Sequence, residues 1–120
     1  MPESFKKLVV WQRAIQLTVQ VYNLTSSFPE SERFGLTNQM RRAAVSVASN
    51  LAEGYGRASK GEYIQFLGHA RGSSYEVETQ LTIARKLGFG AEQPLARAEE
   101  LCAEVGRMLA AMVIGLRRKG

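Results

Sequence analysis

Residues 63–84, YIQFLGHARGSSYEVETQLTIA, place apolar or small side chains at alternating steps of four and three residues. Steps of this size return to the same face of an α-helix, which has 3.6 residues per turn, whereas a half-buried strand alternates every two residues. The stretch therefore predicts one long helix with a buried face. The positions on that face are Tyr63, Leu67, Ala70, Ser74, Val77, Leu81 and Ala84.

Three further stretches of the chain show the same spacing. They cover about residues 6–27, about residues 37–55, and residues 95–116 near the end of the chain. Short breaks that contain glycine, near residues 35, 55 and 89, separate the stretches. Because no stretch alternates as a strand does and the breaks are short, we predict an all-α fold, an antiparallel up-down four-helix bundle. The length fits a single domain that spans residues 1–120.

Local sequence patterns predict where the helices begin. Residues 27–30 (SFPE) and 59–62 (SKGE) both have the S-x-x-E spacing of a capping box at a helix N-terminus. Thr37 is the candidate cap of the second helix. Gly68 and Gly72 lie inside the third helix, where glycine costs about 0.5–1 kcal/mol relative to alanine. We expect close packing at these two glycines, although a merely tolerated glycine is the alternative.

Two helices have more apolar surface than a monomer needs. In the first helix, the apolar positions cover close to half of the circumference, whereas a surface helix needs a stripe of only about 100°. We expect this helix to touch two neighbours on different sides. The third helix has a second seam that a monomer would leave exposed, so the pattern favours self-association. That seam contains Ile64, Gly68, Tyr75, Thr79 and Ile83.

The chain is basic. Its 120 residues include 16 Lys and Arg against 11 Asp and Glu, which gives a net charge of +5. Most of the cations are Arg, whose planar guanidinium makes bidentate contacts with phosphate. This bias favours nucleic-acid contact, although the same charge also serves solubility.

We expect a soluble, cytoplasmic protein with no membrane contact. The apolar stretch after Lys7 is four residues long, which is too short for a signal-peptide core. The longest apolar run, residues 108–116, falls far short of the roughly 20 residues that span a bilayer.

The composition leaves little for catalysis. The chain has one Cys, one His and no Asp, which excludes an internal disulfide, a Ser-His-Asp triad and most zinc sites. We interpret His69 as a solvated or interface side chain and Cys102 as a small buried hydrophobe. We therefore predict no catalytic residue, no metal, no cofactor and no small-molecule substrate.

Residues 41–57 contain an unusual density of Arg, Asn and Glu. Arg42 and Glu53 share nearly one helical azimuth, and Glu53 and Arg57 form an i,i+4 pair. One interpretation is a solvated charged face. The other is a polar network that fixes a subunit interface or contacts phosphate. The residues assigned to that network or interface are Arg42, Asn50, Glu53, Arg57 and Glu76.

The chain resembles the four-helix-bundle proteins encoded in intervening sequences of bacterial 23S ribosomal RNA genes. It is similar, within that group, to the accessory variability determinant of diversity-generating retroelements. The residues that carry the resemblance are Phe28-Pro29, Gly35-Leu36, Gln39, Arg41-Arg42-Ala43-Ala44, Ser46, Asn50, Ala52-Glu53-Gly54 and Gly72-Ser73 with Glu76.

The resemblance implies a homo-oligomer, a pentameric ring, with no established activity for most members. It also implies nucleic acid and a reverse transcriptase as partners, because the accessory variability determinant binds both.

Two functions remain open from the sequence. The first is a non-enzymatic module that contacts RNA or DNA phosphates, with salt-sensitive and weakly sequence-specific binding. The second is a protein-interaction scaffold whose charge only keeps it soluble. The candidate phosphate contacts are Arg41, Arg42, Arg57, Lys60, Arg71, Arg117, Arg118 and Lys119.

Overall fold

The computed structural model describes residues 3–119, and four α-helices contain most of them. α1 covers Val9–Thr25, α2 covers Leu36–Tyr55, α3 covers Lys60–Leu87 and α4 covers Glu92–Arg118. Two short 3₁₀ helices, η1 (Phe5–Lys7) and η2 (Glu30–Glu32), precede α1 and α2. Residues 3–119 contain no strand, so the predicted all-α, four-helix fold is confirmed.

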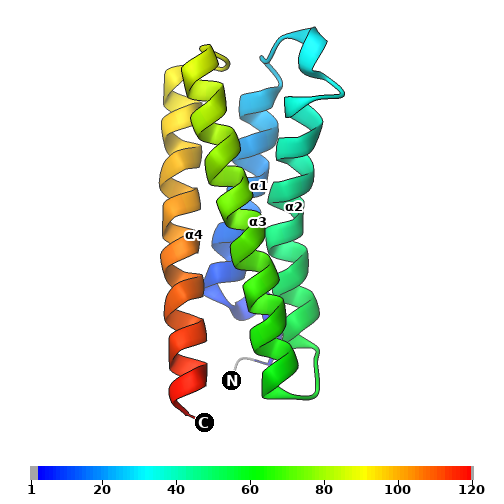
Figure 1. Ribbon diagram of the computed structural model, residues 1–120, viewed down its shortest axis with the longest axis vertical. Coiled ribbons are helices and arrows are strands. Elements are labelled where there is room, and N and C mark those ends of the chain that lie inside the picture. Colours follow the sequence, from blue (N-terminus) through cyan, green and yellow to red (C-terminus); the bar gives the residue numbers. More distant parts are fainter. Residues whose placement is uncertain (1–2, 120) are drawn as a thin grey trace.

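The helices lie side by side around one long core (Figure 1). The colour gradient shows α1 and α3 rising and α2 and α4 descending, so each helix runs back along the one before it. α1 and α3 each contact both α2 and α4, and the bundle measures 46 × 21 × 20 Å. Both ends of the chain and the α2–α3 connection therefore lie at one end, called the lower end below. The α1–α2 and α3–α4 connections lie at the upper end.

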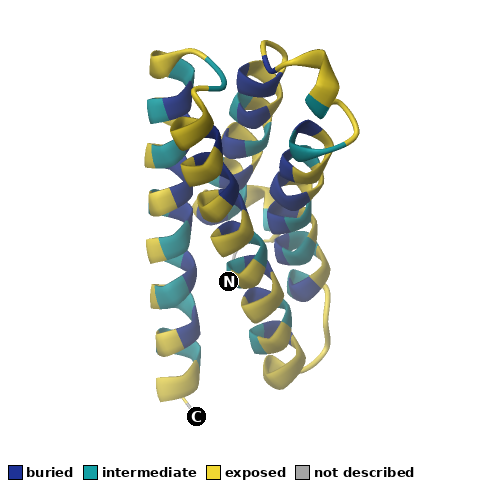
Figure 2. Ribbon diagram, turned by 45° about the horizontal axis from the view of Figure 1, so that its top comes forward, coloured by how far each residue is buried: buried dark blue, intermediate teal, exposed yellow. Residues whose placement is uncertain are grey.

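The buried side chains face inward on every helix (Figure 2). All seven positions of the predicted seam in residues 63–84 are buried, which confirms that seam. The upper half of the core includes Leu17, Met40 and Leu81, and the lower half includes Leu51 and Leu109. Each of these side chains is fully buried, and such burial contributes about 1.5–3 kcal/mol per residue.

The start of the first helix differs from the prediction. A continuous helix was expected over about residues 6–27, but Leu8 has extended backbone angles (φ −70°, ψ 124°) that separate η1 from α1. The helix also ends earlier, at Thr25. Ser27 does not cap the next segment, because its hydroxyl donates to the Leu24 carbonyl at 3.1 Å. The predicted capping box at residues 27–30 is therefore wrong.

The predicted Thr37 cap is also wrong, whereas the Ser59 cap is confirmed. α2 begins one residue before Thr37, and the Leu36 amide donates to the Glu32 carboxylate at 3.0 Å. Thr37 is instead buried inside the helix. At the start of α3, the Ser59 hydroxyl accepts from the Glu62 amide at 3.1 Å, as a capping box requires.

The close packing expected at Gly68 and Gly72 occurs elsewhere. A Cβ added at either glycine would meet nothing within 4 Å. At Gly54, by contrast, a Cβ would lie 2.6 Å from the Cβ of Phe66 on α3. α2 and α3 therefore approach most tightly near the end of α2, and the two α3 glycines face open space within the chain.

The first helix has the two neighbours predicted for it, α2 and α4. Even so, Ile15, Val19 and Tyr22 remain 37%, 55% and 43% exposed. Between residues 3 and 119, no helix is long and apolar enough to cross a membrane.

Candidate functional site

The fold gathers most of the candidate phosphate contacts at the lower end of the bundle. Arg57 and Lys60 flank the α2–α3 connection, and Arg117, Arg118 and Lys119 end α4. All five side chains are exposed. The structure thus brings together residues that are about 60 positions apart in the sequence.

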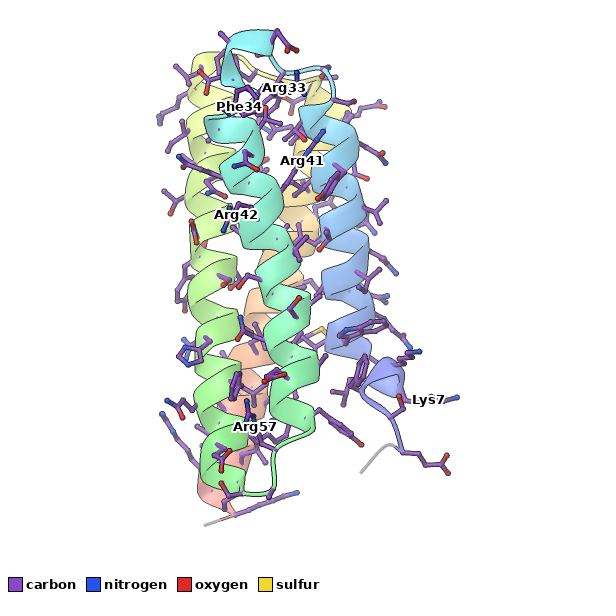
Figure 3. All side chains as sticks on the ribbon, turned by 90° about the vertical axis from the view of Figure 1, so that its right-hand side faces the viewer. Lys7, Arg33, Phe34, Arg41, Arg42 and Arg57 are labelled. Atoms are coloured by element: carbon purple, nitrogen blue, oxygen red, sulfur yellow. The ribbon has the colours of Figure 1, made fainter. Side chains whose placement is uncertain are left out.

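Lys6 and Lys7 of η1 join this group, although neither is among the phosphate contacts predicted from the sequence. Both are exposed, and η1 lies at the lower end, where Figure 3 labels Lys7. An up-down bundle with an even number of helices places its first and last residues at the same end. That rule, applied to the predicted fold, would have found the two lysines.

Among residues 3–119, one cation of the lower end, Arg57, has a carboxylate partner. The Arg57 guanidinium lies 2.5 Å from the Glu53 carboxylate and 3.9 Å from that of Glu62. It also stacks on Phe66, with 4.7 Å between its Cζ and the centre of the ring. The remaining lower-end cations have no ion pair with a carboxylate of residues 3–119. We call these six residues the basic end: Lys6, Lys7, Lys60, Arg117, Arg118 and Lys119.

The upper end has the opposite character. Arg33 pairs with Glu30 at 3.6 Å, and Arg85 binds both Glu92 and Glu99 at 2.7–2.8 Å. The hydrogen bonds from Arg85 hold the pKa of Glu92 below its ordinary value. Arg33 and Arg85 are therefore engaged with carboxylates, whereas Lys86, next to Arg85, forms no ion pair with residues 3–119.

Arg41 and Arg42 lie apart from the basic end, in the upper half of α2 (Figure 3). The Arg41 guanidinium stacks on Tyr22, with 4.6 Å between its Cζ and the centre of the ring. Its Nε donates to the Thr25 hydroxyl at 2.9 Å. Arg42 is exposed and forms no ion pair with residues 3–119. The two arginines line a shallow hollow of about 480 Å³ between α1 and α2, beside Tyr22 and Val45.

Arg71 belongs to neither group. It lies in the middle of α3 and is half-buried. One of its terminal nitrogens donates to the Tyr75 hydroxyl at 2.8 Å, and its Nε is buried without a hydrogen-bond partner in residues 3–119. The hydrogen bond of this side chain is therefore to a residue of its own helix, α3.

The five residues assigned to a polar network do not form one network within the chain. Asn50 donates to Ser46, whose hydroxyl meets that of Ser73 on α3 at 2.8 Å. Glu53 and Arg57 form a separate ion pair nearer the lower end. Arg42 and Glu76 are exposed and join neither cluster; within residues 3–119, Glu76 accepts a side-chain hydrogen bond from Gln80 alone, at 3.4 Å.

The groups with reactive chemistry are isolated. Cys102 is 4% exposed, its Sγ donates to the Ser74 carbonyl, and burial raises the pKa of its thiol to about 12. His69 is exposed, and its ring packs against the Phe66 ring in a T-shaped arrangement with 5.6 Å between the two ring centres. Within residues 3–119, no three His, Cys, Asp or Glu side chains come close enough to hold a metal ion.

Comparisons with known proteins agree with this fold. The family model for 23S rRNA-intervening sequence proteins matches residues 6–111. A crystal structure of a protein of unknown function from the S23 ribosomal protein family of Bacteroides thetaiotaomicron superposes with a TM-score of 0.78. It is 18% identical, and the match covers 88% of this chain and 98% of that one. No curated protein matches the chain.

Proposed function

The chain belongs to the 23S rRNA-intervening sequence protein family, and from this membership we propose that it is a non-enzymatic homo-oligomer that contacts nucleic-acid phosphates. The contact surface in this proposal is the basic end. The resemblance carried by residues between Phe28 and Glu76 and the family match over residues 6–111 point to the same family.

The observation that carries the proposal is the uneven neutralisation of charge. Six cations of the basic end have no carboxylate partner in residues 3–119, whereas at the upper end Arg33 and Arg85 are paired and Lys86 is not. Unpaired Lys and Arg side chains on one surface release counterions when they meet phosphates, which drives binding. Association of several copies would bring several basic ends close together and strengthen the field.

Binding of this kind is measured by fluorescence anisotropy. Labelled structured RNA and duplex DNA are titrated with the protein over a range of salt concentrations. We expect affinity to fall steeply with salt, with a slope of about −0.9 per phosphate contacted on DNA. We expect little sequence preference, because phosphate contacts carry no base information.

A matched pair of variants tests the site. Replacing Arg117, Arg118 and Lys119 with alanine should weaken binding and reduce the salt slope by up to about three for each chain that contacts the probe. Replacing Lys86, Arg97 and Arg107 removes the same charge elsewhere on α3 and α4 and should have little effect. Equal losses from the two triple variants would show that only net charge matters and would reject the basic end as the site.

A protein-interaction scaffold is the second candidate. It is favoured by an uncharged hollow of about 280 Å³ between α1 and α2, lined by side chains such as Trp11, Ile15 and Val45. Absence of binding to either nucleic acid at low salt would reject the first function and leave this one. Capture experiments with a reverse transcriptase as the candidate partner would then follow.

A further inference from the structure

The face formed by α1 and α2 has the composition of a protein interface. Two hollows follow one another along it and share Val45; one includes Trp11 and Ile15, and the other includes Tyr22 and Arg42. Neither hollow is lined by a Lys, Asp or Glu residue. Enrichment in aromatic residues and Arg, with depletion of Lys and acidic residues, is typical of protein–protein contacts.

The outward face of α3 carries two glycines that no other part of residues 3–119 covers. Gly68 and Gly72 lie one turn apart on it, and a Cβ at either position would meet nothing within 4 Å. Tyr75, the next bulky residue along the face, is 50% exposed. Small residues in the surface of a helix let another helix approach closely. Packing within residues 3–119 does not explain why glycine occurs at these two positions.

The charges on the two faces lie at matching heights. The Ser46–Ser73 hydrogen bond of 2.8 Å fixes the register of α2 against α3. Arg42 lies four residues above Ser46 on α2, and Glu76 lies three residues above Ser73 on α3, which runs in the opposite direction. At a rise of 1.5 Å per residue, the two charges differ in height by only about 1.5 Å. Neither forms an ion pair with residues 3–119.

We propose that a second copy of this chain docks the outward face of its α3 against the α1–α2 face of the first, with its Glu76 beside Arg42. This inference rests on the homo-oligomer part of the proposed function and names its interface. A rotation about an axis parallel to the bundle keeps every residue at its height, so it brings Arg42 of one copy level with Glu76 of the next.

The geometry of the contact determines the kind of assembly. Two different faces meet, so the contact is head-to-tail, and it either closes into a ring or continues as a filament. A side face of the bundle measures about 46 by 20 Å, which suffices for the roughly 800 Å² per partner of a stable interface. In this arrangement Arg42 serves association, and phosphate contact is left to the basic end.

A charge swap tests the contact. Arg42→Glu and Glu76→Arg each place like charges opposite one another, so sedimentation velocity should show each variant at the mass of one chain, 13.3 kDa. The double variant restores opposite charges and should recover the wild-type mass. In an equimolar mixture of the two single variants, both contacts between unlike chains join opposite charges, so the mixture should associate although neither variant does so alone. Circular dichroism checks that each variant folds.

The inference is overturned if the wild-type chain is a monomer, if the single variants keep the wild-type mass, or if the double variant fails to recover it. A second pair of variants tests the α3 surface directly. Gly72→Leu should block association, whereas Gly106→Leu on α4, where a Cβ also meets nothing within 4 Å, should not. Association of the Gly72→Leu variant at wild-type strength would equally reject the contact.

The two proposals fail separately. Charge-swap variants report on association by mass, and the Arg117, Arg118 and Lys119 variant reports on phosphate binding by anisotropy. A monomer that binds nucleic acid would reject the interface and the homo-oligomer part of the proposed function, but not the phosphate contact. An assembly that obeys the charge swap but binds no nucleic acid would reject the phosphate contact alone.

Discussion

α3 presents two contrasting sides to its surroundings, and glycine makes the contrast visible. On the side toward α2, Gly54 leaves room for Phe66, and a Cβ there would lie 2.6 Å from the Phe66 Cβ. On the outward side, Gly68 and Gly72 leave space that no atom of the chain fills. Each glycine costs helix stability relative to alanine. Of these three positions, Gly54 is the one where packing among residues 3–119 explains why the residue is glycine.

The same contrast applies to the larger side chains of α3. Leu67 is fully buried between the helices, whereas Tyr75, two turns further along, is 50% exposed. Stability within one chain therefore depends on the inner side, and the outer side is available for association. Substitutions on the two sides should separate these roles.

The largest expected contrast is in thiol reactivity. Cys102 touches the inner side of α3 through the Ser74 carbonyl, and burial raises the pKa of its thiol to about 12. The thiolate is the reactive form, and an exposed thiol has a pKa near 8.5. At pH 8, iodoacetamide should therefore modify Cys102 at least about a thousandfold more slowly than a cysteine on the outer side.

The comparison chain carries Cys102→Ala, Thr79→Cys and Glu76→Arg, since Thr79 is exposed on α3 and the Glu76→Arg change keeps a second copy from covering it. Mass spectrometry gives both rates, and in urea the two thiols should react equally. Rapid labelling of Cys102 in the native protein would show that the inner side opens readily.

Side-chain truncation should give the next largest difference. Leu67→Ala removes a fully buried side chain and should lower the free energy of unfolding by about 2–5 kcal/mol. Tyr75→Ala on the outer side, measured in the Glu76→Arg background where association does not contribute, should change it by no more than about 0.5 kcal/mol. Urea unfolding followed by circular dichroism measures both values. Similar losses for the two variants would remove the distinction between the sides.

Gly54→Ala should have a smaller effect, but still a destabilising one. The added Cβ would press on the Phe66 Cβ, which is close to the α3 backbone and cannot rotate away. Overpacking of this kind costs about 1–3 kcal/mol. Alanine's higher helix propensity offsets about 0.5–1 kcal/mol of that, so we expect a net loss of about 1–2 kcal/mol in the free energy of unfolding. A gain in stability would mean that α2 and α3 do not pack this closely.

Gly72→Ala should have the smallest effect, with the opposite sign. The added Cβ meets nothing within the chain, so the free energy of unfolding should rise by about 0.5–1 kcal/mol. The measurement is best made in the Glu76→Arg background, where association does not contribute. A loss of stability there would reveal a neighbour that the outward face meets within one chain.

Much of the candidate site could be predicted from the sequence as a set of residues, but not as an arrangement. Arg41, Arg42 and Arg57 were all candidate phosphate contacts, because each is an Arg on a polar helix face. The structure separates them: Arg41 stacks on Tyr22, Arg42 is free, and Arg57 is paired with Glu53. Whether an Arg forms an ion pair depends on which carboxylates come within 4 Å of it. Spacing along one helix predicts the neighbours on that helix, but not those on the other helices.

The sequence by itself determined the number and type of the helices and the residues that face the core. Those properties follow from a periodicity of 3.6 residues, which is local, and from glycines that end helices. The tertiary structure decided which glycines are crowded, which cations are neutralised, and that Lys6 and Lys7 lie at the same end as Lys119. Contacts of that kind join distant parts of the chain, because they depend on how the helices pack against each other.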